Sequence, residues 1–365
     1  MHLIQKIKNS PKWYWLLLGY HFLFIYFAFT YRQQRGRSDA TLYWFQNTYT
    51  DGKSWLDFLN YGADFLLFLN YPLVAIGLPH RFAFLLYGTI GFLGCLQWFK
   101  WAQFVAGSKT VFRNKTILLC VFLLPNLHYW TAGLGKEPIL FLGISTFFYA
   151  LSTHNFKSLQ FILGSIIVLL IRPHLAMILF AALLTGLIFL KKSNLKKRIW
   201  LFLSCLFVSA LSFYLVLQLS GIRYFSWKRI SLFNEYSILS FRNSGSYVPM
   251  LEYNYFYKWF TFHFRPLFFD VHSIPMFFAS IENLILLLIS ILTILVCLRY
   301  FSQLRFPFWM KVTFIFSILV TVIYIERYAN LGIFMRTKMM FQPFLLIACL
   351  HLIAQGYSIY KSKQL

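Results

Sequence analysis

The chain has 365 residues, of which 59% are hydrophobic and 12% charged, and its mean hydropathy is +0.63. This composition excludes an ordinary soluble domain and leaves room for roughly ten membrane-spanning helices of about 20 residues each. The net charge of +24 does not indicate nucleic-acid binding, because the basic residues are spread over many short loops rather than gathered on one face. They indicate cytoplasmic loops that fix the topology.

Apolar runs of spanning length alternate with loops rich in lysine and arginine. The N-terminal segment carries Lys6, Lys8 and Lys12 and is expected in the cytoplasm. Threading from there predicts an all-α integral membrane protein of about ten spans, a single polytopic domain over 1–365 with both termini cytoplasmic. The expected spans are 13–31, 81–99, 116–132, 137–152, 158–171, 175–190, 200–219, 276–298, 312–326 and 339–357.

Two outer loops are long, 32–80 and 220–275, and the second lies between spans seven and eight. Within the first, residues 54–62 are expected to form a surface helix. The run 63–79 is short and broken by a proline, which predicts a re-entrant or interfacial element. Counting it as a span gives an eleven-span alternative that would place the lysine-rich turn 191–198 outside. Long loops in a compact domain usually carry function.

The acidic residues are sorted to one side in this topology. Nine of the ten fall outside the cytoplasm, and Glu282 lies within a span near the same face. The positive-inside rule does not require this sorting, because acids contribute little to it. An enzyme site that faces outward would explain it. The nine are Asp39, Asp51, Asp57, Asp64, Glu137, Glu235, Glu252, Asp270 and Glu326.

Four groups of residues on this outer face could carry chemistry. The first is Asp39 with Tyr43, just after the first span. A carboxylate at the lipid–water boundary can act as general base toward a sugar hydroxyl, or it can simply pair with Arg35 and Arg37. Asp39 is therefore a candidate catalytic residue.

The second group lies in the turn 125–138 (PNLHYWTAGLGKEP), where the chain re-enters the membrane. Its glycines permit a close approach of the backbone to a ligand. Glu137 precedes Pro138 and could cap the next helix, but capping does not explain Lys136 beside it. We expect His128 and Glu137 to be catalytic candidates and Lys136 to bind substrate.

The third group is the turn 171–175 (IRPHL), which places Arg172 and His174 between two very apolar runs. An arginine near the hydrocarbon is costly and normally faces a polar interior or a ligand. Arg172 could instead extend to the outer head groups. Both residues are candidates for substrate binding.

The fourth group joins the end of the long loop to the last outer turn, 326–340. Arginine forks bind phosphate oxygens in a bidentate manner, and several together would neutralise a pyrophosphate. Asp270 could act as a catalytic base or as a structural partner of Arg265, and the cations could instead serve only as interfacial anchors. The substrate-binding candidates here are Arg265, Glu282, Arg327, Arg336 and Lys338.

Sequence motifs for metals or cofactors are lacking. The histidines are scattered, and no HExxH motif or carboxylate cluster with helical spacing occurs. The five cysteines lie inside apolar runs without metal-ligand spacing. There is no P-loop, GxGxxG or GxSxG motif either. We therefore expect no metal, no cofactor, and a donor that reaches the outer face already activated.

An outward-facing, arginine-rich site with a candidate base fits a sugar linked to polyprenyl phosphate. The lipid would lie between helices, the phosphates would contact arginines, and sugars would stack on tyrosine and tryptophan. Because phosphate on polyprenol is a good leaving group, transfer needs positioning, charge neutralisation and a base.

The blocks PNLHYWTAGLGKEP, IRPH, FRPLFFD…IENL and NLGIFMRTKMMFQP resemble those of multi-spanning bacterial proteins from exopolysaccharide and O-antigen loci. The ten-span plan with its large outer loop is similar to that of O-antigen polymerases, ligases and the peptidoglycan polymerases of the shape and division family. The aspartate in the first outer loop resembles that of GT-C glycosyltransferases and EpsG-like polymerases.

The resemblance implies a glycan polymerase or glycosyltransferase in a bacterial plasma (inner) membrane, with its active site facing the periplasm or outside. Its partners would be the polyprenyl-linked glycan, the lipid bilayer and other polysaccharide-assembly proteins. It implies that the base is Asp39 or Asp270, and the residues do not decide between them. The pyrophosphate-binding residues would be Lys136, Arg172, Arg265 and Arg336.

Two other functions stay open. A non-catalytic carrier or flippase for the lipid-linked glycan should need a polar path, yet spans five to seven carry almost no polar residues. An acyltransferase would need an intramembrane histidine beside Asn or Asp, for which His128 near Asn126 is the faint candidate. The sugar, its linkage and the number of residues added are not encoded in a recognisable way.

Overall fold

The computed structural model describes residues 12–34, 38–45, 52–106, 120–189 and 226–364, with isolated helical positions between 196 and 214. Within these ranges the regular elements are helices, and one isolated antiparallel bridge joins Tyr247 and Asn330. Most of the lysine-rich turn 191–198 and of the expected span 200–219 lie outside the described residues, as does the start of the expected span 116–132.

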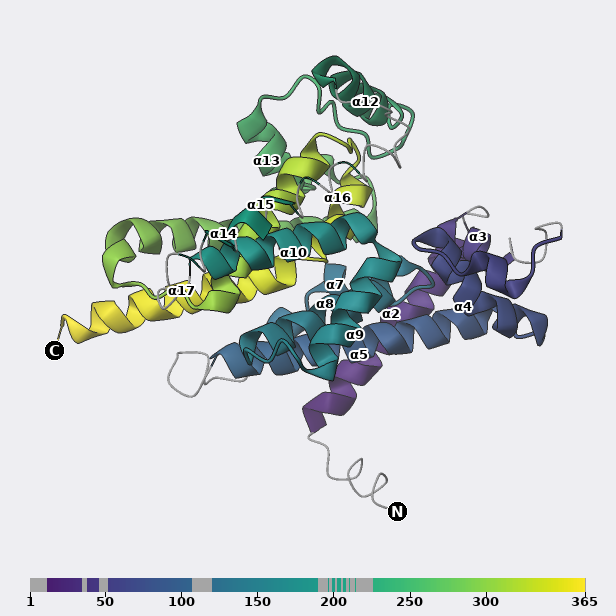
Figure 1. The fold of residues 1–365 in the computed structure, drawn as a ribbon, viewed down its shortest axis with the longest axis horizontal. Coiled ribbons are helices and arrows are strands. Elements are labelled where there is room, and N and C mark those ends of the chain that lie inside the picture. Colours follow the sequence, from purple (N-terminus) through teal and green to yellow (C-terminus); the bar gives the residue numbers. More distant parts are fainter. Residues whose placement is uncertain are drawn as a thin grey trace. The chain divides into compact units, whose positions relative to one another are not determined.

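The chain forms two compact units. The first comprises Met1–Gln103 and Lys115–Arg172, and the second comprises Phe104–Asn114 and Pro173–Leu365. The helices of the first unit, purple to blue-green in Figure 1, are α2 (Lys12–Gln34), α3 (Asp39–Phe45), η2 (Trp55–Phe58), α4 (Ala63–Ala75), α5 (His80–Ala106, whose end enters the second unit), α7 (Pro125–Thr131), α8 (Lys136–Ser152) and α9 (Leu159–Ile171).

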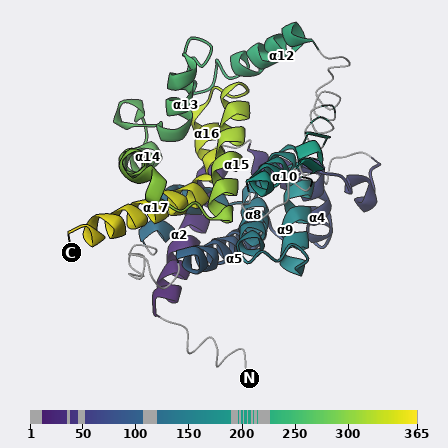
Figure 2. The same cartoon turned by 60° about the vertical axis from the view of Figure 1, so that its left-hand side comes forward.

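The closest helix packing in the first unit joins α8 and α9, which lie side by side (Figure 1, Figure 2). The Ser158 side chain caps α9 by accepting from the Phe161 N–H at 3.2 Å. A Cβ atom on Gly164 would lie 2.8 Å from the Phe147 nitrogen, so only glycine permits this helix approach. The hairpin brings the start of α8 to the end of α9.

The second unit, teal to yellow in Figure 1, packs α10 along α15 and α14 along α17, and these pairs lie side by side in both views. Its helices are α10 (Pro173–Ile188), α12 (Trp227–Leu239), α13 (Tyr255–Phe264), η4 (Phe268–Asp270), α14 (Ile274–Tyr300), η5 (Phe301–Gln303), α15 (Phe308–Ile325), α16 (Leu331–Lys338) and α17 (Gln342–Ser362).

Five of the described helices are long and apolar enough to cross a membrane: α2, α5, α14, α15 and α17. The pair α7 and α8, bent by 116°, would make a sixth if it is one broken span. Only 22% of the spanning segment of α14 is buried, against 61% for α15. Its apolar side chains therefore face outward, as they would toward lipid. The chain is a helical membrane protein by these criteria.

Of the ten expected spans, the described helices include five that meet these criteria, or six with the bent pair. At 1.5 Å per residue, α9 (13 residues) and α10 (16 residues) are about 20 and 24 Å long, short of a 30 Å hydrocarbon core. The expected re-entrant run 63–79 contains α4, a helix of 13 residues with Pro72 inside it. Its position relative to a membrane stays a prediction, as does the cytoplasmic location of the termini.

One expectation about the long outer loops needs correction. Residues 54–62 form only η2, a four-residue 3₁₀ helix, rather than a surface α-helix. The expected outer loop 220–275 contains α12, α13 and η4, and its place outside the membrane stays a prediction. Asn254 begins α13 by accepting from the Tyr257 N–H at 2.8 Å, a cap that stabilises the aromatic helix after it.

Candidate functional site

The first unit contains a buried ion pair where α8 begins and α9 ends. Arg172 Nη2 donates to Glu137 Oε1 at 2.7 Å, and their side chains are 13% and 1% exposed. Glu137 lies in the first turn of α8, where the positive end of the helix dipole stabilises a carboxylate. Removing one partner of such a pair costs about 3–5 kcal/mol, because the other charge is left buried.

Lys136 connects this ion pair to the first outer loop. Its Nζ lies 6.0 Å from the centre of the Tyr43 ring on α3, a cation–π distance. Asp39 is the first residue of α3 and is exposed. Because it precedes Tyr43 by four residues, both lie on the same face of the helix. We call Tyr43, Lys136, Glu137 and Arg172 the Arg172 cluster.

Gly62 joins the loop before α4 to the same cluster. Its N–H donates to the carbonyl oxygen of Leu170, the second-to-last residue of α9, at 2.7 Å. Its φ is +76°, a conformation that residues with a Cβ rarely adopt. A Cβ at this position would lie 3.8 Å from Lys136 Nζ. Three segments expected to share an outer site, 32–80, 125–138 and 171–175, therefore do contribute to one place within the first unit.

In the second unit, Lys338 is fully buried at the end of α16. Its Nζ donates to the carbonyl oxygens of His263 and Arg265, each at 3.1 Å, and to Asn283 Oδ1 at 2.9 Å. An ammonium has three N–H donors, and these contacts use all of them. Burial lowers the pKa of Lys338 to about 7, while the charge of Glu282 opposes the shift.

Arg265 and Asp270 form a second buried ion pair beside Lys338. Arg265 Nε donates to Asp270 Oδ2 at 3.0 Å, Nη2 donates to Oδ1, and Nη1 donates to the Tyr253 hydroxyl at 3.2 Å. The Leu267 N–H also donates to Asp270 Oδ2 at 2.9 Å. Of the two expectations for Asp270, the structure shows the contact with Arg265, and the role as base stays a prediction. We call His263, Arg265, Asp270, Asn283 and Lys338 the Lys338 cluster.

The remaining candidates of the second unit lie around these groups. Glu282 is 5% exposed on α14, next to Asn283, and Arg336 is half-buried on α16 two residues before Lys338. The Arg327 guanidinium lies 4.1 Å from the centre of the Phe233 ring, and burial lowers the pKa of Arg327. The exposed His174 has Nε2 3.3 Å from the Tyr324 hydroxyl.

His128, expected in the same turn as Lys136 and Glu137, lies on α7. It is 0% exposed, and its Nδ1 lies 2.7 Å from Nδ1 of His21 on α2. The rings of Tyr20 and Phe122 surround it, with centroids 5.0 and 5.1 Å away. Its contacts therefore favour a role in the interior of the first unit, and its catalytic role stays a prediction.

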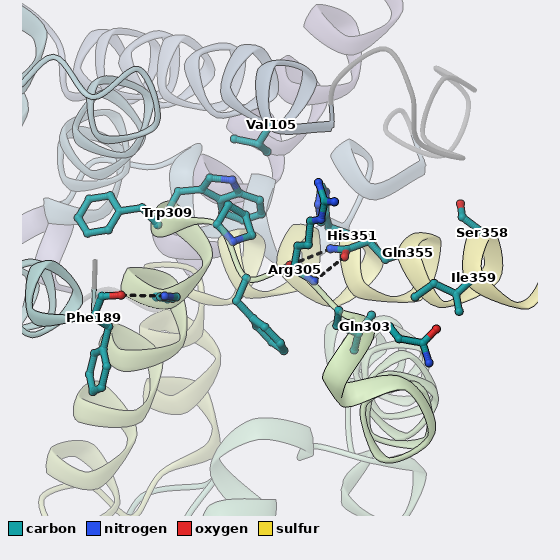
Figure 3. Close-up of a pocket in the computed structure, with 14 residues that line it drawn as sticks. Val105, Phe189, Gln303, Arg305, Trp309, His351, Gln355, Ser358 and Ile359 are labelled. Atoms are coloured by element: carbon teal, nitrogen blue, oxygen red, sulfur yellow. Dashed lines mark hydrogen bonds between the residues drawn. The ribbon is translucent and has the colours of Figure 1, made fainter. Parts of the chain in front are cut away.

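The second unit also has a pocket that the sequence did not reveal (Figure 3). It lies where α10 ends and α15 begins, against α17. Lys311 Nζ donates to the Phe189 carbonyl oxygen at 3.1 Å, and the Arg305 N–H donates to Gln355 Oε1 at 2.8 Å. His351 also lines it. In the predicted topology these helix ends face the cytoplasm, which stays a prediction.

Comparison of the chain with protein-family models, with curated proteins and with solved structures finds no match. The chemistry of the candidate site therefore rests on its residues alone. Those residues are an exposed carboxylate, a lysine against a tyrosine ring and an arginine oriented by a buried glutamate. Such a set can bind an anion and remove a proton from a hydroxyl.

Proposed function

We propose that the protein is a membrane glycosyltransferase or glycan polymerase that uses a sugar donor linked to polyprenyl (pyro)phosphate. The observation that supports it most is the Arg172 cluster, in which residues from three segments predicted to face outward bring together two cations, one of them against Tyr43 of the helix that begins with Asp39. A bacterial inner membrane, an outward-facing site and a GT-C-like arrangement of about ten spans belong to the same proposal.

The phosphate of the donor would contact Lys136 and Arg172. The Glu137 carboxylate fixes the Arg172 guanidinium at 2.7 Å, so the arginine needs little reordering when an anion binds, and preorganised charges stabilise a leaving group most effectively. Glu137 then acts as a positioning residue rather than as a proton donor. The apolar runs of the bundle accommodate the polyprenyl chain.

Asp39 is the better of the two candidate bases. Asp270 accepts on both carboxylate oxygens from Arg265 and the Leu267 N–H, which ties it to a structural role. Asp39 is exposed on α3. It would take the proton from an acceptor hydroxyl while that oxygen bonds to the anomeric carbon of the donor. The bond from the anomeric carbon to phosphate breaks, and polyprenyl (pyro)phosphate leaves.

The test is transfer of labelled sugar from a polyprenyl-diphosphate glycan pool by the purified protein in nanodiscs. Asp39→Asn should abolish product without abolishing lipid binding, and Arg172→Ala should weaken lipid binding. Asp57→Asn is the matched control, because Asp57 is another exposed acid of the same loop. Arg172-dependent binding without product from the wild type would support the carrier or flippase instead. No binding and no product would refute the proposal.

A further inference from the structure

Three metal-binding side chains from three helices meet inside the first unit. They are His21 on α2, Cys95 on α5 and His128 on α7, and each is 0% exposed. Their ligand atoms all lie within 4.8 Å of one another. The residues are separated by 74 and 33 positions in the chain, so no sequence motif reveals the group.

Hydrogen bonds to backbone carbonyls define which nitrogen of each histidine carries a proton. His21 Nε2 lies 2.9 Å from the carbonyl oxygen of Gly88, and His128 Nε2 lies 2.6 Å from that of Phe122. A carbonyl oxygen only accepts, so both Nε2 atoms donate. In a neutral imidazole the other nitrogen then has a lone pair. The two Nδ1 atoms, 2.7 Å apart, therefore direct lone pairs at each other.

Two facing lone pairs at this distance repel unless a positive centre lies between them. A proton would convert one ring to an imidazolium, which is costly in a buried site lined by the rings of Phe92, Phe122 and Tyr20. A metal ion would use both lone pairs, with a thiolate beside it to offset the charge. The two N–H···O=C bonds are the usual outer contacts that orient metal-ligating histidines.

Cys95 is placed to supply that thiolate. The Thr131 hydroxyl donates to the Leu127 carbonyl oxygen at 2.7 Å, so its oxygen accepts from the Cys95 thiol, with sulfur and oxygen 3.7 Å apart. A metal that binds the sulfur displaces the thiol proton. Ordinary metal–nitrogen bonds of about 2.0–2.1 Å set the two Nδ1 atoms about 3.3–3.5 Å apart, which the rings reach by shifts of a few tenths of an ångström.

We propose that Nδ1 of His21, Nδ1 of His128 and Sγ of Cys95 bind one thiophilic metal ion, Zn²⁺ or Cu⁺, inside the first unit. Imidazole and thiolate ligands suit both ions. With one thiolate and two neutral imidazoles, the Cu⁺ site is neutral and the Zn²⁺ site carries one positive charge. A buried site of three protein ligands thus favours Cu⁺, while Zn²⁺ would take a fourth ligand.

The test uses the full chain in nanodiscs, stripped with a chelator and loaded separately with Zn²⁺ and with Cu⁺. We expect one ion per chain by mass spectrometry, release of one proton on binding, and X-ray absorption with two nitrogen ligands and one sulfur. His21→Ala, His128→Ala and Cys95→Ser should each lower the affinity for the metal by at least about 10-fold. That is the smallest loss usually seen when a residue hydrogen-bonded to a metal ligand is replaced, and loss of a ligand itself should cost no less. Cys349→Ser and His351→Ala, in the second unit, should not.

A variant that fails to fold would lose metal for a trivial reason, so the wild type provides a second readout. With Co²⁺ as the probe, the wild type should show thiolate-to-cobalt charge-transfer absorption. The proposal is overturned if the wild type retains neither Zn²⁺ nor Cu⁺, or if X-ray absorption finds no sulfur ligand. A measured ¹⁵N–¹⁵N coupling between the two rings would equally overturn it, because a shared proton would then occupy the gap.

Discussion

Replacing Arg172 by methionine tests whether the Arg172 cluster is held by its ion pair. The substitution keeps most of the side-chain volume but leaves the Glu137 carboxylate, 1% exposed, without its guanidinium. Breaking a buried pair in this way costs about 3–5 kcal/mol, and Arg172 is itself only 13% exposed, so solvent screening reduces this little. At roughly 2–4 °C per kcal/mol, the melting temperature should fall by about 6 °C or more.

The assay is thermal unfolding of the purified protein in detergent, with Arg81→Met as the control, because Arg81 is exposed at the start of α5 in the same unit. The double variant Arg172→Met with Glu137→Gln should recover part of the loss, since it removes the unpaired charge. The reasoning is refuted if Arg172→Met destabilises by less than about 1 kcal/mol, the value of an exposed ion pair, or if the double variant is no better than the single one.

Three further predictions follow from local contacts. Burial lowers the pKa of Lys338 to about 7, so above that pH the unfolded state binds more protons than the folded state. The free energy of unfolding of the wild type should therefore rise relative to that of Lys338→Met between about pH 7 and 10, and equal pH profiles would contradict this. Gly62→Ala, at φ +76°, should cost about 1–2 kcal/mol by denaturant unfolding, whereas Gly245→Ala, with open space around it, should cost less than about 0.5 kcal/mol. Asp270→Asn should destabilise the second unit by about 3–5 kcal/mol in the same assay, yet each folded molecule should keep its transfer activity. Loss of that activity would indicate that Asp270, rather than Asp39, is the base.

Helix positions in the long apolar runs could be predicted from the sequence. The expected spans 81–99 and 276–298 lie inside α5 and α14, and the turn residue Glu137 does lie in the first turn of α8. Hydrophobicity over about 20 residues is a strong local signal. Shorter runs such as 158–171 are apolar enough for a membrane span but form helices that are too short. The number of spans predicted from the sequence is therefore larger than the number of described helices that meet both criteria.

One helix of segment 220–275 had a signal that aromatic composition concealed. Asn254 begins α13 by accepting from an N–H three residues later, as Asn330 does for α16 outside this segment, and such a capping residue is a readable helix start. Pairing across the fold had no such signal. His21 and His128 are 107 residues apart, and nothing local predicts which histidine contacts which.

The candidate site was predicted at the level of segments but not of contacts. The sequence placed Lys136, Glu137 and Arg172 on one outer face, and the structure joins the last two in an ion pair. The sequence offered Asp270 both as a base and as a partner of Arg265, and it could not decide whether the Arg265 fork binds this carboxylate or a phosphate, since both geometries use the same donors. The structure shows the contact with Asp270.

The most direct measurement of the central claim is sugar transfer in nanodiscs by the wild type, Asp39→Asn and the exposed control Asp57→Asn. We predict product from the wild type and from Asp57→Asn, and a loss of at least about 100-fold in rate for Asp39→Asn, the lower range of general-base catalysis, with donor binding preserved. Equal rates for all three proteins would contradict the assignment of the base, and absence of product from a wild type that is folded and supplied with donor would contradict the proposed function.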